Sequence, residues 1–172
     1  MSQALIGIDP TDFRATVAAG GGPAFKLGTY GGWDDPLEGL KVYIYGQATA
    51  AITQFFCCVE GIANANFSMI TTANTAPGQL GGHGARVGVA QATLATGQFG
   101  WFQIAGRGTV NTLASAALGT RLNTTATAGS VDDDGTAGAR VINGMVLKAA
   151  TGGAQANNSS AVLQYPTVGL TI

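Results

Sequence analysis

Charged residues are scarce in this chain of 172 residues, where aspartate, glutamate, lysine and arginine together make up 10%. Helices normally cover their exposed faces with glutamate and lysine, so this scarcity disfavours a helical fold. The formal net charge is −1, which gives no overall attraction to nucleic acid or to an acidic membrane surface. We therefore expect neither as a partner. Weak self-repulsion instead favours a protein that works within an assembly.

The few positive charges have an uneven distribution. Between Gly61 and Val131 the only charged residues are Arg86, Arg107 and Arg121. These arginines either keep the turns soluble or form a mildly basic face that docks on an acidic partner surface. Three arginines are too few to indicate binding to DNA.

Cysteine and histidine are nearly absent: Cys57 and Cys58 are adjacent, and His83 is the single histidine. Neighbouring strand residues point to opposite faces, so we expect no disulfide between the cysteines, which are interpreted as core-filling thiols. A lone histidine in a Gly-Gly-His-Gly loop lacks the neighbours that catalysis needs. The acidic run 132–134 lacks the ligand spacing of an EF-hand and predicts a solvated loop. We therefore expect no metal site, no cofactor and no enzyme activity.

Long apolar runs are missing as well. No stretch of the sequence reaches the length that a helix needs to cross a bilayer. The first residues lack the basic region and apolar run of a signal peptide. With no cysteines besides the adjacent pair, the chain has no disulfide framework, which fits a reducing compartment. These features predict synthesis and assembly in the host cytoplasm.

The chain is rich in glycine, with 27 residues, and in small polar residues that favour strands joined by tight turns. The segment 86–108 predicts a hairpin, with a turn at 95–97. Its second strand carries Phe99 and Trp101 on one face and Phe102 and Ile104 on the other. A strand with two apolar faces is buried on both, or is covered on one by a partner chain. We expect this hairpin to be the centre of the fold.

The remaining pattern predicts an all-β barrel or sandwich of about eight or nine short strands. Residues 1–36 predict an extended N-terminal arm, whose large apolar groups include Phe13, Phe25 and Trp33, and residues 37–172 predict the β domain. Pro166 marks a strand edge or a bend. Besides the hairpin, strands are expected at 40–46, 50–60, 67–70, 109–113, 118–125, 140–149 and 161–172.

The order of these strands and turns resembles the head decoration (cement) proteins of tailed bacteriophages. The segments that carry the resemblance are KVYIYGQA at 41–48, VGVA at 87–90, ATGQFGWFQIAG at 95–106, LNTTATAGSV at 122–131 and INGMV at 142–146. The resemblance extends over roughly residues 25–170. It implies a small β-barrel that binds the outside of an icosahedral capsid. Such proteins commonly form trimers at local three-fold positions and clamp neighbouring capsid subunits.

On this resemblance we expect a virion structural protein that decorates and stabilises a phage head, with the major capsid protein as partner and a homotrimer as the assembled form. For contacts between copies we predict Phe99, Trp101 and Phe102. For contact with the capsid we predict the arm residues Phe13, Phe25 and Trp33, with Arg86 and Arg107 as electrostatic partners.

Two alternatives stay open from the sequence. The first is another virion component, such as a tail, fibre, head-spike or shell protein. The second is a carbohydrate-binding β module, in which Trp33, Tyr43, Tyr45 and Trp101 form a platform on which sugars stack.

Overall fold

The computed structural model describes residues 8–61, 63–152 and 157–171, and in these ranges it is almost entirely β. The predicted all-β class is therefore confirmed. Eleven strands occur in the described part of the chain, which is more than the eight or nine expected. A three-residue 3₁₀ turn, η1 (Val17–Ala19), lies between β1 and β2. In chain order the strands are β1 (Phe13–Arg14), β2 (Tyr30–Asp35), β3 (Gly39–Ala48), β4 (Cys57–Glu60), β5 (Asn66–Met69), β6 (Val87–Ala90), β7 (Phe99–Thr112), β8 (Arg121–Thr124), β9 (Val131–Asp132), β10 (Arg140–Leu147) and β11 (Asn157–Thr171).

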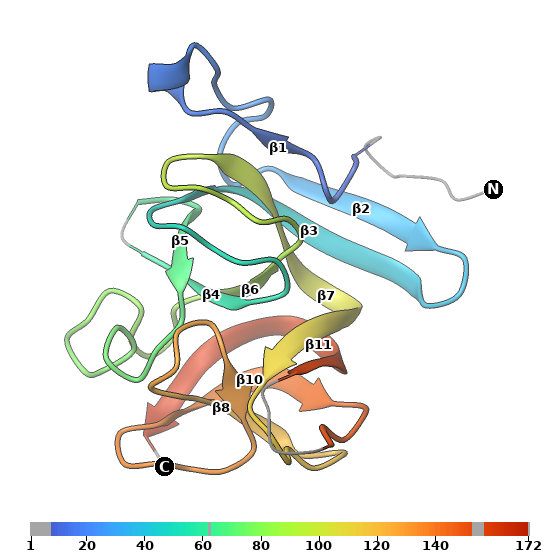
Figure 1. Ribbon diagram of the computed structural model, residues 1–172, viewed down its shortest axis with the longest axis vertical. Coiled ribbons are helices and arrows are strands. Elements are labelled where there is room, and N and C mark those ends of the chain that lie inside the picture. The colour runs from blue at the N-terminus through green and yellow to red at the C-terminus, as the bar shows by residue number, and fades with distance from the viewer. Residues whose placement is uncertain (1–7, 62, 153–156, 172) are drawn as a thin grey trace.

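Strand pairing closes two circuits that share β7. The first circuit runs from β7 through β3, β5, β4 and β6 back to β7. The second runs from β7 through β9, β8, β10 and β11 back to β7. Figure 1 shows β7 descending from the upper half of the molecule, which holds the first circuit, into the lower half, which holds the second. The molecule is therefore elongated along this one strand.

The predicted hairpin forms the junction of the fold. β6 and β7 pair antiparallel, and Gly97 has the left-handed φ of 80° that the predicted turn requires. The connection is longer than the three residues predicted, because the strands are separated by residues 91–98. The segment at 109–113, expected as a separate strand, is the end of β7.

β7 bends where it leaves one circuit and enters the other. Gly106 has a φ of 91°, and a Cβ atom there would lie 2.6 Å from the carbonyl oxygen of Leu40. The buried side chain of Gln103 donates from Nε2 to the carbonyl oxygens of Ala105 and Arg107, at 3.2 and 3.0 Å, one on each side of Gly106. The bend thus needs a residue without a side chain and a buried amide that satisfies its carbonyls.

The two circuits have separate hydrophobic cores. The core of the first contains Cys58 and a stacked pair, Phe67 and Phe102, whose ring centroids are 4.1 Å apart. The core on the side of the second circuit contains Cys57 together with residues of β10 and β11. The adjacent cysteines therefore enter different cores, as expected for neighbours on a strand. Both thiols are free, as predicted.

A third cluster covers the outer face of β3 and β7. Phe25 packs against Tyr45 and Trp101, with ring centroids 5.3 and 5.2 Å apart, and Ile8 joins the same cluster. The backbone N–H of Ala24 donates to the Tyr45 hydroxyl at 3.0 Å. The second apolar face of the hairpin is therefore covered by the N-terminal part of the same chain.

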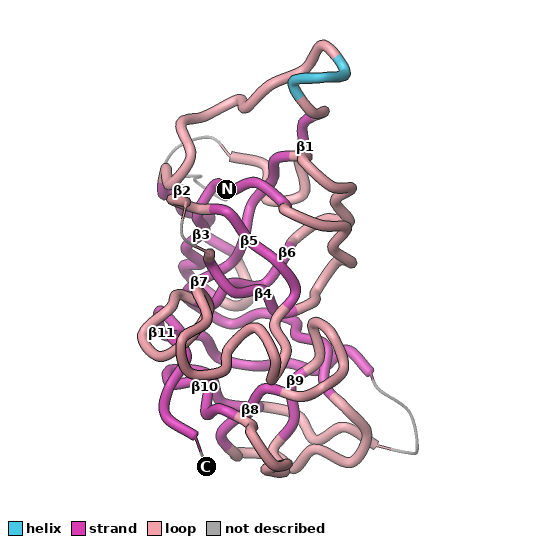
Figure 2. Tube along the Cα trace, turned by 90° about the vertical axis from the view of Figure 1, so that its left-hand side faces the viewer, coloured by secondary structure: helices cyan, strands magenta, loops and turns pink. Residues whose placement is uncertain are grey.

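This packing corrects the predicted arm. Residues 30–35 form β2, which pairs along its whole length with β3, so the boundary expected at residue 36 falls within a β-hairpin. β1 pairs with the start of β7. Between these strands, the loop that carries η1 stands out at one end of the molecule (Figures 1 and 2). Residues 1–7 of the predicted arm lie outside the described residues.

The predicted contacts between copies also need correction. Phe99, Trp101 and Phe102 are 3%, 1% and 0% exposed in the single chain. Their side chains fill the cores and the third cluster, and so have almost no surface with which to contact another chain. Any contact between copies has to use other residues.

Candidate functional site

The residues predicted to contact a capsid lie on different elements. Phe13 is half exposed on β1, whereas Phe25 and Trp33 are half-buried in the third cluster. Arg107 donates from Nε to the Ser160 hydroxyl at 3.0 Å and lies 3.6 Å from Oε1 of Glu38. Of this group, therefore, Phe13 and Arg107 remain on the surface.

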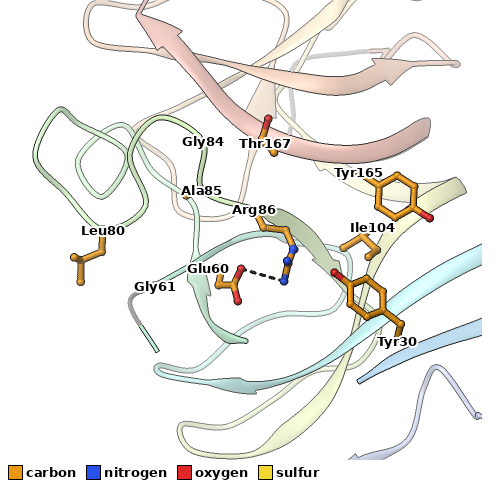
Figure 3. Close-up of a pocket in the computed structure, with 10 residues that line it drawn as sticks. All are labelled: Tyr30, Glu60, Gly61, Leu80, Gly84, Ala85, Arg86, Ile104, Tyr165 and Thr167. Atoms are coloured by element: carbon orange, nitrogen blue, oxygen red, sulfur yellow. Dashed lines mark ion pairs between the residues drawn. The ribbon is translucent and has the colours of Figure 1, made fainter. Parts of the chain in front are cut away.

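Arg86 lies in a pocket of about 380 Å³ at the junction of the two circuits, which we call the waist pocket (Figure 3). The segment before β6 is joined to β11 there, because Gly84 N–H donates to the carbonyl oxygen of Val168 and Val168 N–H donates to that of Ala85, at 2.7 and 2.9 Å. The pocket thus has walls from both circuits. Its lining residues are Tyr30, Glu60, Gly61, Leu80, Gly84, Ala85, Arg86, Ile104, Tyr165 and Thr167.

A single ion pair lies inside the waist pocket. Arg86 Nη1 is 3.1 Å from Oε2 of Glu60, and the other oxygen of Glu60 accepts the backbone N–H of Ala65 at 2.6 Å. The Arg86 guanidinium also lies over the ring of Tyr30, 5.8 Å from its centroid. The arginine is thus held by a carboxylate and by an aromatic face, rather than extending freely toward a partner.

Tyr165 is directed to the rim of the pocket by a β-bulge in β11. The pairing with β10 shifts between Asn143↔Thr167 and Met145↔Leu163, which leaves residues 164–166 opposite Gly144. Tyr165 takes a φ of 50°, uncommon for a residue with a side chain, and is 60% exposed. Figure 3 shows its ring on the opposite side of Ile104 from the ring of Tyr30. Strained residues and bulges gather at functional sites, which makes this pocket the candidate site.

Sequence reasoning found only part of this site. It singled out Arg86 and the bend at Pro166, but it missed Glu60, Tyr30 and Tyr165. The Tyr-Pro pair within an otherwise strand-like segment was the available signal, because proline breaks the ladder and allows a bulge. The partners of Arg86, Glu60 and Tyr30, lie 26 and 56 residues away in the sequence, which no local pattern could bring together.

The predicted sugar platform is wrong. Tyr43, Tyr45 and Trp101 are 3%, 1% and 1% exposed, and Trp33 is half-buried beside them. These rings pack against each other and against Phe25, so no flat aromatic surface is left for a sugar. The aromatic residues form a core cluster instead.

The acidic run is only partly a solvated loop. Asp132 is buried in β9, whereas Asp134 is exposed. Burial raises the pKa of Asp132, and the carboxylate of Asp133 accepts the backbone N–H of Ala117 at 3.0 Å. Within the described ranges, no group of three histidine, cysteine or acidic side chains is placed to hold a metal ion.

The two thiols are expected to be unreactive in the native protein. Burial raises the pKa of Cys57 to about 12 and that of Cys58 well above its ordinary value, so both stay protonated near neutral pH. Ellman's reagent at about pH 8, close to the pKa of a free thiol, should therefore detect no thiol before unfolding and two per chain in guanidinium. Rapid reaction of the native protein would show that one of the cores opens readily.

No family model matches the chain, and a search of curated proteins also found no match. In the part of the chain that the structure describes, no helix is long and apolar enough to cross a membrane.

Proposed function

We propose that the protein is a structural component of a tailed-bacteriophage head, which binds the outside of the assembled shell and stabilises contacts between capsid subunits. One observation supports the proposal most directly. The segments that carry the resemblance to decoration proteins fall on β3, β6, β7, β8, β9 and β10. Because these strands belong to both circuits, the resemblance is spread over both halves of the body rather than confined to one local motif. The two closed circuits also fit the barrel architecture that the resemblance implies.

The end of the molecule that carries η1 is the surface we propose for contact with the shell. Phe13, on β1, is 50% exposed there, and Val17, in η1, is 67% exposed. The loop that carries η1 stands out from the body (Figure 2). Phe25 and Trp33, first expected to touch the capsid, anchor the base of this loop on the third cluster. Arg107 is a further candidate for electrostatic contact.

Binding to an assembled lattice explains how such a protein would stabilise a head. A ligand that binds the shell but not its separate subunits shifts the equilibrium toward the shell. A homotrimer, whose three copies are linked, would also gain from multivalency when each contact is weak. Weak contacts from each chain of a trimer would thus add up to stable binding to the shell.

Co-sedimentation with assembled shells of the major capsid protein from the same phage tests the proposal. We expect the purified protein to sediment with assembled shells and not with dissociated capsid subunits. The double variant Phe13→Ser, Val17→Ser should bind less, whereas Leu118→Ser, which alters a leucine that is 61% exposed on another loop, should bind normally. No binding to shells would contradict the function, and normal binding by the double variant would contradict the proposed contact.

A homotrimer remains part of the proposal. Light scattering after size exclusion should then give a mass near three times 17.2 kDa. A monomeric mass would contradict the homotrimer but not the decoration function, which the co-sedimentation test decides. The apolar face of the hairpin, which first indicated a partner chain, is covered by the chain itself and therefore does not require a trimer.

A further inference from the structure

We propose that the waist pocket binds one unit of a neutral saccharide, held between Tyr30 and Tyr165. The proposal concerns a site that the capsid contact does not use, and it does not depend on the function proposed above. A volume of about 380 Å³ lies at the small end of the range for small-molecule sites, roughly 300–1,000 Å³.

The charges in the pocket select for a neutral ligand. Among its ten lining residues, Arg86 and Glu60 are the only charged ones, and they pair with each other at 3.1 Å. The pocket therefore carries no net charge. An anion would approach the Glu60 carboxylate and a cation would approach the Arg86 guanidinium, so each meets repulsion as well as attraction.

The polar groups of the pocket match a ligand with several hydroxyls. A guanidinium has five N–H donors, and within the described residues the Arg86 side chain contacts the Glu60 carboxylate and the ring of Tyr30, so donors remain for a ligand. Glu60 offers acceptor oxygens, and Thr167 adds a hydroxyl. A hydroxyl both donates and accepts, so neighbouring hydroxyls of a sugar can bond to Arg86 and Glu60 together.

The two tyrosines supply the apolar surface that a sugar ring needs. Tyr30 is 45% and Tyr165 is 60% exposed, and Figure 3 shows them on either side of Ile104, from β2 and β11. The C–H face of a pyranose ring is apolar and packs on such rings. The backbone of Tyr165 takes a costly left-handed conformation that presents its ring at this place. An aromatic side chain held exposed in this way indicates a binding contact.

Titration of the full chain with defined sugars tests the proposal. Maltotetraose, cellotetraose and the tetramer of N-acetylglucosamine serve as neutral probes, with sialyllactose as the anionic comparison, and binding is followed by saturation-transfer NMR and calorimetry. We expect at least one neutral probe to bind in the millimolar range or tighter, and sialyllactose to bind more weakly. If none of the three neutral probes binds, or if sialyllactose binds more tightly than all of them, the proposal is overturned.

Variants locate the binding. Tyr165→Asn removes the ring and introduces a residue that tolerates a left-handed backbone conformation. Tyr30→Ala removes the other ring from an ordinary position in β2. Each should weaken binding by about tenfold, the effect of losing one aromatic contact. Leu170→Ala, which alters an exposed leucine that does not line the waist pocket, should bind like the parent chain. If both tyrosine variants bind the sugar with the affinity of the parent chain, the sugar binds elsewhere and the proposal is overturned.

Discussion

Replacing Gly106 by alanine should destabilise the protein by about 3 kcal/mol, which combines backbone strain and steric overlap. The residue has a φ of 91°, and the new Cβ would lie 2.6 Å from the carbonyl oxygen of Leu40 and 3.0 Å from Cα of Lys41. Both obstacles are backbone atoms of β3, which cannot rotate away as a side chain can. Urea unfolding followed by circular dichroism measures the change in the free energy of unfolding.

Gly119→Ala is the matched control for this substitution. Gly119 has a similar φ of 79°, but a Cβ atom there would meet no atom within 4 Å. The control therefore measures only the cost of placing alanine in a left-handed backbone conformation, and it should lower the free energy of unfolding by about 1 kcal/mol. Equal effects of the two substitutions would show that β3 and β7 separate easily at the bend, contrary to the close packing described above.

Trp101→Ala should lower the free energy of unfolding by about 3–5 kcal/mol, as expected for the loss of a buried aromatic side chain. The ring is 1% exposed and contacts both Phe25 and Tyr45, with centroids 5.2 and 5.0 Å away. Because this cluster holds the N-terminal segment on the body, its loss should also release that segment. Limited trypsin digestion should then cut early after Arg14 and Lys26, which mass spectrometry of the fragments would show.

Phe102→Ala separates this release from general destabilisation. Phe102 follows Trp101 on the same strand and is also fully buried, but it faces the first core, where it stacks on Phe67. The loss of stability should be similar, about 3–5 kcal/mol. Cleavage after Arg14 and Lys26 should nevertheless stay slower than in the Trp101 variant. If both variants release the N-terminal segment equally, the third cluster does not anchor it.

The strands predicted best are those with strong alternation. The pattern at 40–46 predicted β3, and 140–149 predicted β10, because one face of each meets a core. β2 was missed because Gly31, Gly32 and two aspartates are poor strand formers, and its conformation depends on pairing with β3. A Cβ on Gly31 would lie 2.7 Å from Ile8, so this glycine leaves room for the N-terminal segment.

Backbone conformation explains the other errors. The strand expected over 50–60 is shortened to β4, because Phe55 takes a φ of 66°, which lies outside the extended region and interrupts the strand. Such a conformation is imposed by packing, so the hydrophobic periodicity of the sequence does not predict it. The same limit applies to the candidate site: the sequence placed a bend at Pro166, but the direction of the Tyr165 ring depends on a bulge opposite Gly144.

The sharing of β7 has a mechanical consequence. Two domains joined by a flexible linker swing about hinge residues, because few contacts cross the linker. Here the connection is a continuous strand, paired with β3 along its first part and with β11 along its second. A pull on one end of the molecule is therefore carried to the other by a hydrogen-bonded ladder loaded in shear, and the body behaves as a stiff rod rather than as two jointed pieces.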